Sequence, residues 1–309
     1  MTNKRVDEYN GNTMEGDFMH IDKLKYYIDL YECKNFTETA KKNFISQAAL
    51  SQFISSLEKQ FGLSLFDRSQ TPIKPTAAGT SLYEESKILY KQYEYMLDRM
   101  DRIKTESMPA LRIAYSSPVD IQALLPIVSR FKESYPDAEL KLNRITLKEA
   151  DEYITKELCD LVVSFSTEFI ENKHTKFKVL KEGRYMAVVG KGHDLFDKNV
   201  ITTEELYKYP LIMLSKNVIG NLYDKMLERV KEDGFKPMIE KTVDDIESEM
   251  FSIITDGFIG FAPESQSLSD FGDSIRMIPI EGSSHKYCIA ACYLKENTNQ
   301  TLKAFLELI

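Results

Sequence analysis

The chain has 309 residues, of which 43% are hydrophobic and 28% charged, and its formal net charge is −8. This length and mixture predict two or three folded domains, and the sequence has no run of about 18 apolar residues that could cross a membrane. Residues 1–17 carry no apolar core segment, which argues against a secretory signal peptide. We therefore expect a cytoplasmic protein.

The N-terminal region divides into an extension and a first helix. Residues 1–18 have no apolar periodicity and are expected to form a disordered extension, with Met14 and Met19 as alternative start positions to Met1. From His20 to Cys33 apolar residues recur at helical spacing, which predicts an amphipathic helix. The residues of this stripe are Leu24, Tyr27, Ile28 and Tyr31.

A helix-turn-helix follows. Thr37–Lys42 predicts one short helix, residues 43–45 leave room only for a tight turn, and Ser46 is a favourable N-cap for a second helix running to Glu58. The inward face of the second helix consists of Leu50, Ile54, Leu57 and Phe61. Its outward face presents amides and hydroxyls suited to the edges of DNA bases. The outward residues are Gln47, Ala48, Ser51, Gln52, Ser55 and Lys59.

A wing is expected after the second helix, with a short strand at Leu63–Phe66 and a proline-containing loop from Asp67 to Pro75. Arg68, at the end of the strand, either contacts a DNA phosphate or forms a salt bridge with Asp67 or Glu58. Residues 19–79 hold eight basic and six acidic residues, a net charge of +2 (8 − 6). Such a weak basic surface needs helix N-termini, hydroxyls and a second copy of the domain to bind phosphates.

Thr76 is expected to cap a long helix that runs to about Glu106 and carries a heptad pattern. A sustained heptad predicts a partner helix, and a helix of about 30 residues spans ~45 Å, too long for one small domain to cover. We therefore expect this helix to form a dimer. The heptad positions are Leu82, Leu89, Met96 and Ile103, with Ser86, Tyr93 and Met100 as companions.

Strands and helices alternate from Pro109 onward. A first βαβαβ unit is expected with strands at 111–115, 139–145 and 161–165 and helices at 118–135 and 147–156. A second unit is expected with strands at 185–189, 211–214, 236–243 and 258–261, and the chain then returns through strands at 275–280 and 287–294 to a final helix at 299–308. This order predicts an α/β domain of two lobes.

A small-molecule site is expected between the two lobes, where strands end and helices begin. Ser116-Ser117-Pro118 offers two hydroxyls and free N–H groups at a helix N-terminus, which suits a small organic anion. The alternative is that Ser117 only caps the helix. The remaining candidates are polar or aromatic residues near strand ends: Thr146, Ser164, Phe165, Ser166, Ser215, Lys216 and Phe261.

Catalytic and metal chemistry find little support in the sequence. The four histidines lie in four separate regions, no cysteine or histidine cluster has metal-ligand spacing, and Gly190–His193 is predicted to be a turn. We expect no cofactor and no enzymatic activity. The four cysteines, Cys33, Cys159, Cys288 and Cys292, are expected to be reduced and to act as small buried apolar residues, with a redox-sensing pair as the alternative.

The pattern from Asn35 to Gly79 resembles the N-terminal signature of LysR-type transcriptional regulators. The matching residues are Asn35-Phe36-Thr37, Ala40, residues 46–51, Ile54, Leu57-Glu58, Phe61-Gly62, residues 65–68 and residues 76–79. Ala48 replaces the proline or small residue usual in the family, and Gln52 replaces a residue that is often basic. Gln52 therefore fits adenine recognition better than phosphate contact.

The resemblance implies a domain plan and partners for the whole chain from Met19 onward. The expected parts are a winged helix-turn-helix domain at 19–79, a dimerisation helix at 80–106 and an effector domain at 107–309 that is similar to periplasmic binding proteins. Lobe I is expected at 107–182 and 284–309, and lobe II at 183–283.

The implied partners are double-stranded DNA with an interrupted inverted repeat, a small effector, RNA polymerase, and further copies of the chain in a dimer or tetramer. The alternatives are a thiol-based redox regulator of the same family and a two-lobed binding protein or enzyme. The candidate DNA contacts are Thr37, Ser46, Gln47, Ala48, Ser51, Gln52, Ser55, Arg68 and Thr76.

Overall fold

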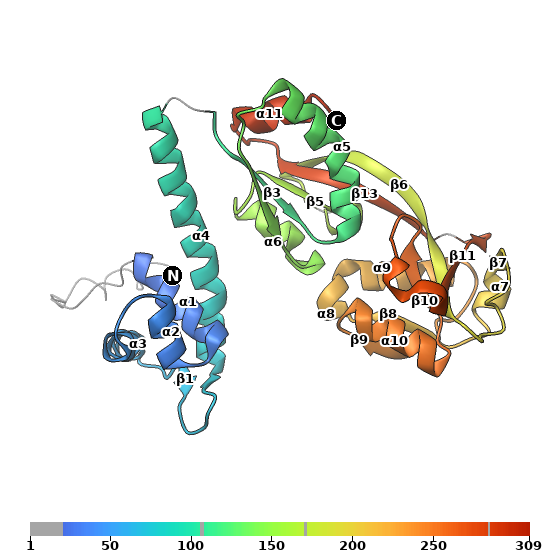
Figure 1. Cartoon of the computed structure of the whole chain (residues 1–309), viewed down its shortest axis with the longest axis horizontal. Coiled ribbons are helices and arrows are strands. Elements are labelled where there is room, and N and C mark those ends of the chain that lie inside the picture. Colours follow the sequence, from blue (N-terminus) through green and yellow to red (C-terminus); the bar gives the residue numbers. More distant parts are fainter. Residues whose placement is uncertain (1–20, 106–107, 170–171, 284) are drawn as a thin grey trace, which may run out of the picture. The chain divides into compact units, whose positions relative to one another are not determined.

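The computed structural model describes residues 21–105, 108–169, 172–283 and 285–309, and for residues 101–105 the backbone alone. The chain divides into two compact units between Asp101 and Arg102 (Figure 1). The expected disordered extension and His20 lie outside the described residues.

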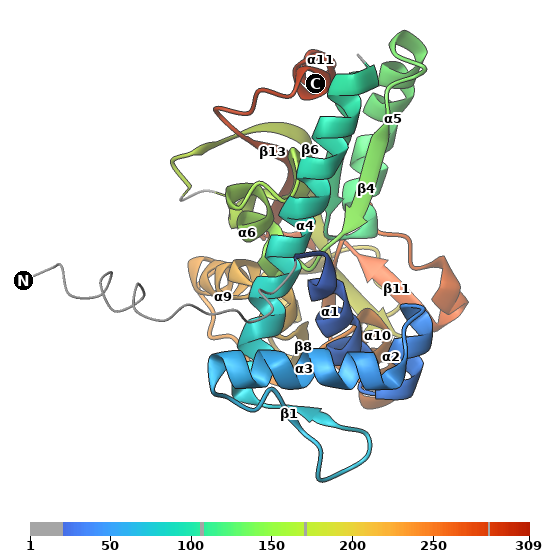
Figure 2. The same ribbon diagram turned by 90° about the vertical axis from the view of Figure 1, so that its left-hand side faces the viewer.

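The first unit is a small helical domain followed by a long helix. Its elements are η2 (Ile21–Lys23), α1 (Leu24–Cys33), α2 (Phe36–Lys42), α3 (Gln47–Phe61), β1 (Phe66–Asp67), β2 (Lys74–Pro75) and α4 (Ala77–Thr105). The predicted inward residues Tyr27, Leu50, Ile54 and Leu57 meet in one core, together with Leu30, which the predicted stripe did not include. Phe61, at the end of α3, was predicted to face inward but is 43% exposed. The β1–β2 ladder and its loop form the wing, which projects beside α3 (Figure 2).

Side-chain caps fix where these helices begin. Asn35 accepts the N–H groups of Thr37 and Glu38 at the start of α2, and Ser46 accepts the N–H of Ala49 at 3.1 Å at the start of α3. The strand expected at Leu63–Phe66 is observed at Phe66–Asp67, so the prediction was right only for Phe66. The Glu58 carboxylate accepts the N–H of Leu65 at 2.9 Å, so the chain joins the ladder only from Phe66.

Lobe I of the second unit is built on parallel strands, as expected. Strand β3 (Leu111–Tyr115) pairs in parallel with β4 (Leu140–Arg144) and with β5 (Leu161–Phe165). The helices and turns of this lobe are α5 (Pro118–Ser134), η3 (Leu147–Glu149), α6 (Ala150–Thr155), η4 (Ser166–Glu168) and α11 (Gln300–Leu306).

Two long strands run from lobe I into lobe II. Strand β6 (Thr175–Gly190) pairs along its first part with β13 (Lys286–Leu294), and along its last part with β10 (Gly260–Pro263) and β11 (Ile275–Ile278). The register of β6 with β13 shifts between Ile289 and Ala290. The sequence predicted only the end of β6, because its first part alternates lysines with partly exposed residues and lacks an apolar face.

Lobe II contains a second set of short strands and helices. They are β7 (Ile201–Thr202), α7 (Thr203–Leu206), β8 (Leu211–Leu214), α8 (Lys216–Ile219), α9 (Asn221–Glu232), β9 (Ile239–Val243), α10 (Ile246–Asp256), η5 (Ser269–Ser274) and β12 (Ile280–Glu281). Strands β8 and β9 are parallel. Strand β10 begins two residues later than expected, at Gly260.

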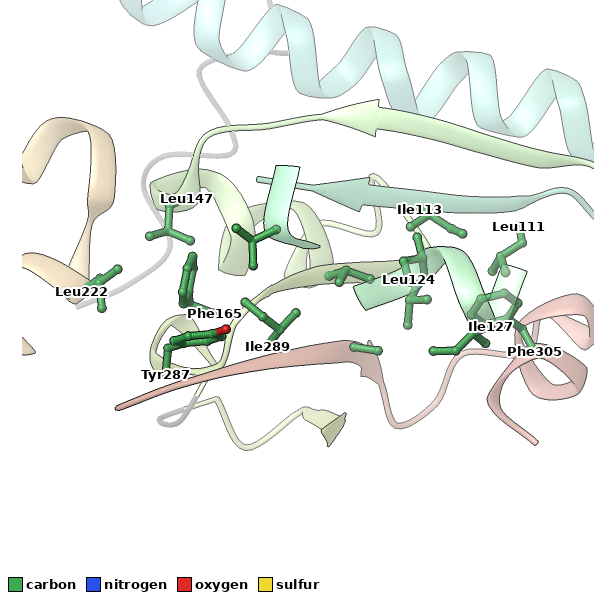
Figure 3. Packing of buried hydrophobic residues seen from close by; sticks show 14 of the residues in the cluster. Leu111, Ile113, Leu124, Ile127, Leu147, Phe165, Leu222, Tyr287, Ile289 and Phe305 are labelled. Carbon is green, nitrogen blue, oxygen red and sulfur yellow. The ribbon is translucent and has the colours of Figure 1, made fainter. Parts of the chain in front are cut away.

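One buried apolar cluster joins the two lobes. Leu147 and Phe165 from lobe I, Tyr287 from β13 and Leu222 from α9 all belong to it (Figure 3). Because the same cluster continues along β3, α5 and α11, residues at the lobe boundary are supported by the core of lobe I.

Candidate functional sites

Helix α3 exposes a continuous polar face beside the wing. Ser46, Gln47, Gln52 and Ser55 are exposed and Ser51 is half-buried. The opposite face is anchored, since Leu50, Ile54 and Leu57 are buried. The helix can therefore present short polar side chains to a groove without disturbing its own domain.

Two of the predicted DNA contacts are also part of the fold. The Thr37 hydroxyl donates to the Gln47 side-chain oxygen at 3.3 Å, which brings the start of α2 next to the start of α3. The Thr76 hydroxyl donates to the Ser64 carbonyl at 2.7 Å and accepts the N–H of Gly79. Thr76 thus caps α4, as the sequence predicts.

Arg68 forms a salt bridge with Glu58, one of the two alternatives predicted for it. Its guanidinium lies 2.7 Å from the Glu58 carboxylate and 5.3 Å from the centre of the Phe36 ring. Since Glu58 also accepts backbone N–H groups at the base of the wing, Arg68 helps to hold the wing against α2 and α3.

The heptad positions of α4 separate into two groups. Leu82 packs against the core of its own domain and Ser86 is buried, whereas Leu89, Met96 and Met100 are 39%, 50% and 54% exposed. Tyr93 is half-buried, and the side chain of Ile103 lies outside the described residues. The exposed apolar strip therefore starts at Leu89, later than the pattern predicted.

The turn at Ser116-Ser117-Pro118 differs from the expectation in one respect: its N–H groups are not free. The Asp120 carboxylate accepts the N–H of Ser116 at 2.9 Å and that of Ser117 at 2.7 Å, and Ser117 caps α5 in return. The S-x-x-D spacing is the sequence signal for such a capping box, and it was missed. The Ser116 hydroxyl also lies 2.9 Å from that of Ser164, which joins two predicted residues.

Burial perturbs the Asp120 carboxyl group. Desolvation raises the pKa of Asp120 to about 6, against the hydrogen bonds from Ser116 and Ser117 that lower it. Its Oδ1 atom is buried and has no hydrogen-bond partner among the described residues. The α5 N-terminus therefore already holds a carboxylate of the chain itself.

The remaining candidates do not converge on one point. Thr146 bonds to Glu149 within its own capping box, Ser215 donates to Asp244, and Lys216 pairs with Asp224 at 2.5 Å on the surface. The Phe261 ring stacks on the buried His285 ring, with centroids 5.1 Å apart. Burial lowers the pKa of His285 to about 4, so this histidine is neutral.

A cavity of about 310 Å³ lies at the lobe boundary, and most of the residues that line it were not among the candidates predicted from the sequence. It contains the predicted residues Phe165 and Ser166, and one side of α9. Three basic side chains and one acidic side chain line it. The further lining residues are Thr167, Glu182, Gly183, Leu222, Lys225, Arg229, Lys286, Tyr287 and Cys288.

Aromatic rings form one wall of this cavity. The rings of Phe165 and Tyr287 have centroids 6.0 Å apart, and both contact Tyr185 behind them. The Tyr287 hydroxyl lies 2.8 Å from the Ser265 hydroxyl. An apolar wall facing basic groups suits a ligand with a carbon skeleton and an acidic group.

The described residues contain no group of three or more histidine, cysteine or acidic side chains that could hold a metal ion. In the same ranges, no helix is long and apolar enough to cross a membrane. All four cysteines are free thiols, and the expectation that they are buried holds for Cys159 and Cys292 but not for the exposed Cys33 or the half-buried Cys288. Cys288 and Cys292 lie four residues apart on β13, about 13 Å at strand spacing, which is too far for a disulfide.

A winged helix-turn-helix domain, a long helix and a two-lobed α/β domain together define a DNA-binding protein controlled by a small ligand. Comparison with known families agrees with this architecture. The LysR substrate binding domain matches residues 104–309, and the bacterial regulatory helix-turn-helix of the lysR family matches residues 21–80. The chain belongs to the LysR family of transcriptional regulators.

Related proteins and structures share this domain order over nearly the whole chain. The transcriptional regulator AlsR of Bacillus subtilis (strain 168) is 24% identical over 94% of this chain and 95% of its own. The crystal structure of the LysR family regulator CbnR superposes with a TM-score of 0.73 at 20% identity over 94% of this chain and 98% of that chain. A structure of full-length CbnR with its target DNA gives the same TM-score at 21% identity and the same coverage of both chains. The predicted family and fold class are confirmed.

Proposed function

We propose that this regulator is a cytoplasmic, non-enzymatic protein that binds an interrupted inverted repeat in DNA as a dimer or tetramer and responds to a small organic anion. The observation that carries the DNA-binding part is the exposed polar face of α3 opposite the buried residues Leu50, Ile54 and Leu57.

Gln47 and Gln52 are the side chains best suited to recognise bases. A glutamine amide can donate to and accept from an adenine edge at the same time, and such a pair discriminates by about 1–3 kcal/mol. Gln47 lies in the first turn of α3, held by Thr37, so its amide has a fixed starting position. Ser46, Ala48, Ser51, Ser55, Arg68 and Thr76 complete the proposed surface.

The exposed strip on α4 supports assembly. Leu89, Met96 and Met100 fall on one side of a helix of 29 residues, and burying them against a second copy would remove apolar surface from water. Two copies place two α3 helices on one DNA molecule, which requires two half-sites.

The cavity beside α9 supports an anionic effector. Lys225, Arg229 and Lys286 line it with Glu182 as the one acidic residue, so its charge favours an anion. Phe165 and Tyr287 supply the apolar wall for the carbon skeleton. Asp120 already occupies the α5 N-terminus, which moves the proposed anion contact from Ser116 and Ser117 to these basic residues.

Selection from random double-stranded DNA tests the proposal. Purified full-length protein should enrich two half-sites in inverted order, and Gln47→Ala should relax the preference at one position of each half-site while leaving non-specific binding unchanged. Enrichment of single half-sites, or of no sequence at all, would contradict the proposed mode of binding.

A further inference from the structure

Glu168 connects the two lobes at the edge of the cavity. It belongs to η4 of lobe I, and its carboxylate accepts the N–H of Leu222 at 3.2 Å and also that of Asn221. These two N–H groups form the first turn of α9 in lobe II. Glu168 is only 8% exposed, so this contact is largely withdrawn from solvent.

Gly220 makes the close approach possible. Its φ is +54° and its ψ −132°, a conformation that side chains with a Cβ atom rarely adopt. A Cβ at this position would lie 3.0 Å from the Glu168 carboxylate and 3.4 Å from Cα of Lys148. The junction between α8 and α9 is therefore shaped to receive lobe I.

The same contact holds two walls of the cavity together. Thr167, next to Glu168, lines one wall and donates its hydroxyl to the Glu168 carboxylate at 3.3 Å. Leu222, from α9 of lobe II, also lines the cavity and donates its N–H to the same carboxylate. The basic residues Lys225 and Arg229 follow on α9, so their distance from lobe I depends on where the start of α9 is held.

Opposing effects act on this carboxylate. Negative charge is stabilised at a helix N-terminus, and burial raises the pKa of Glu168 above its ordinary value against the hydrogen bonds from Asn221, Leu222 and Thr167 that lower it. A contact of this kind can be lost and regained when the surroundings change.

We propose that Glu168 is a positioning residue that fastens α9 to lobe I, and that it thereby couples the occupancy of the cavity to the arrangement of the two lobes. The idea rests on the proposed function, because an effector in this cavity would contact α9 directly. An acidic effector adds a second negative charge beside Glu168, so binding and fastening oppose each other. By linkage, a change in either alters the other by the same factor.

Chemical rescue tests the assignment in the full-length protein. Glu168→Ala leaves the α9 N-terminus without its carboxylate, and acetate is small enough to replace it. We expect amide hydrogen exchange at Asn221 and Leu222 to become roughly tenfold faster in this variant and to slow again when sodium acetate replaces sodium chloride at equal ionic strength. The thermal midpoint should fall in the variant and recover with acetate, whereas wild type should not respond.

Asp245→Ala is the matched control. Asp245 caps α10 with a carboxylate in the same way, but within lobe II and in an exposed position. Its loss should accelerate exchange in α10 only, with no effect on Asn221 and Leu222. A purely structural role for Glu168 would instead accelerate exchange throughout lobe II without any acetate response.

Unchanged exchange at Asn221 and Leu222 in Glu168→Ala would overturn the proposal, and so would faster exchange that acetate does not slow. If Glu168→Ala does not fold, Glu168→Gln keeps the shape and removes the charge. It should show faster exchange confined to the start of α9, and exchange identical to wild type would refute the role. These readouts require no knowledge of the effector, so they stay separate from the ligand screen that tests the proposed anion.

Discussion

Glu249 should make the stability of lobe II depend on pH. This residue of α10 is 5% exposed and packs beneath β10, where its carboxylate would lie 3.2 Å from a Cβ added at Gly260. Desolvation by burial raises its pKa from 4.5 to about 8. A carboxyl group with a raised folded-state pKa favours folding fully below its ordinary pKa, and the contribution is lost as pH rises through the folded-state pKa.

The size of the effect follows from this interval. A change of one pKa unit corresponds to about 1.4 kcal/mol. The rise of the Glu249 pKa from 4.5 to about 8 therefore limits the loss of unfolding free energy to roughly 5 kcal/mol. Glu249→Gln removes the titration while keeping the shape of the side chain. We expect wild type to lose free energy of unfolding as pH rises over this interval, and the variant to lose much less.

Urea unfolding followed by circular dichroism measures this difference, since the chain contains no tryptophan. Glu247→Gln, an exposed glutamate on the same helix, is the control and should behave like wild type. The reasoning fails if Glu249→Gln has no advantage over wild type above pH 8, or if its advantage is the same at every pH.

Three further outcomes follow from the described sites. Gln47→Ala should lose about 1–3 kcal/mol of specific DNA binding, measured by fluorescence anisotropy on a selected site, with non-specific binding unchanged. Leu89→Lys combined with Met96→Lys should separate the protomers in analytical ultracentrifugation and abolish binding to paired half-sites, because both changes place charge in a proposed apolar interface. Lys286→Ala should raise about tenfold the carboxylate concentration needed for the same thermal stabilisation, since one cation near a bound anion contributes on the order of 1.4 kcal/mol. The exposed Lys236→Ala should leave that response unchanged.

The helices of the first unit could be predicted because their signals are local, whereas the strand of the wing and the inward position of Phe61 were predicted wrongly. Helix boundaries follow from caps such as Asn35 and Ser46, and the inward faces follow from apolar spacing over a few turns. The dimerisation pattern on α4 was less reliable. A heptad shows that Leu82 and Leu89 lie on one side of the helix, but not that the first of them packs on its own domain.

The candidate effector site was only partly predictable. Phe165 and Ser166 end a strongly apolar strand, which locates them at the sheet edge, and both line the cavity. Its basic residues come from α9 and from the start of β13, and no local pattern shows that these distant segments meet. The role of Asp120 could have been predicted, because an acidic residue three positions after a serine N-cap is the signal for a capping box. Its carboxylate occupies the helix N-terminus that was expected to bind an external anion.

The two crossing strands have a consequence for how lobe II can move. The chain enters lobe II along β6 and returns to lobe I along β13, and the two strands are hydrogen-bonded to each other along their shared length. A two-stranded ribbon bends across its flat face more easily than it shears, because shearing would break every ladder bond at once. The register shift at Ile289 and Ala290 lies inside the sheet of lobe I, where β13 also pairs with β5, so bending should concentrate in the part before it, where Lys286–Cys288 pair only with Glu182–Arg184. If lobe II moves by bending of this ribbon, ligands of different size should produce different angles of the same movement rather than different movements.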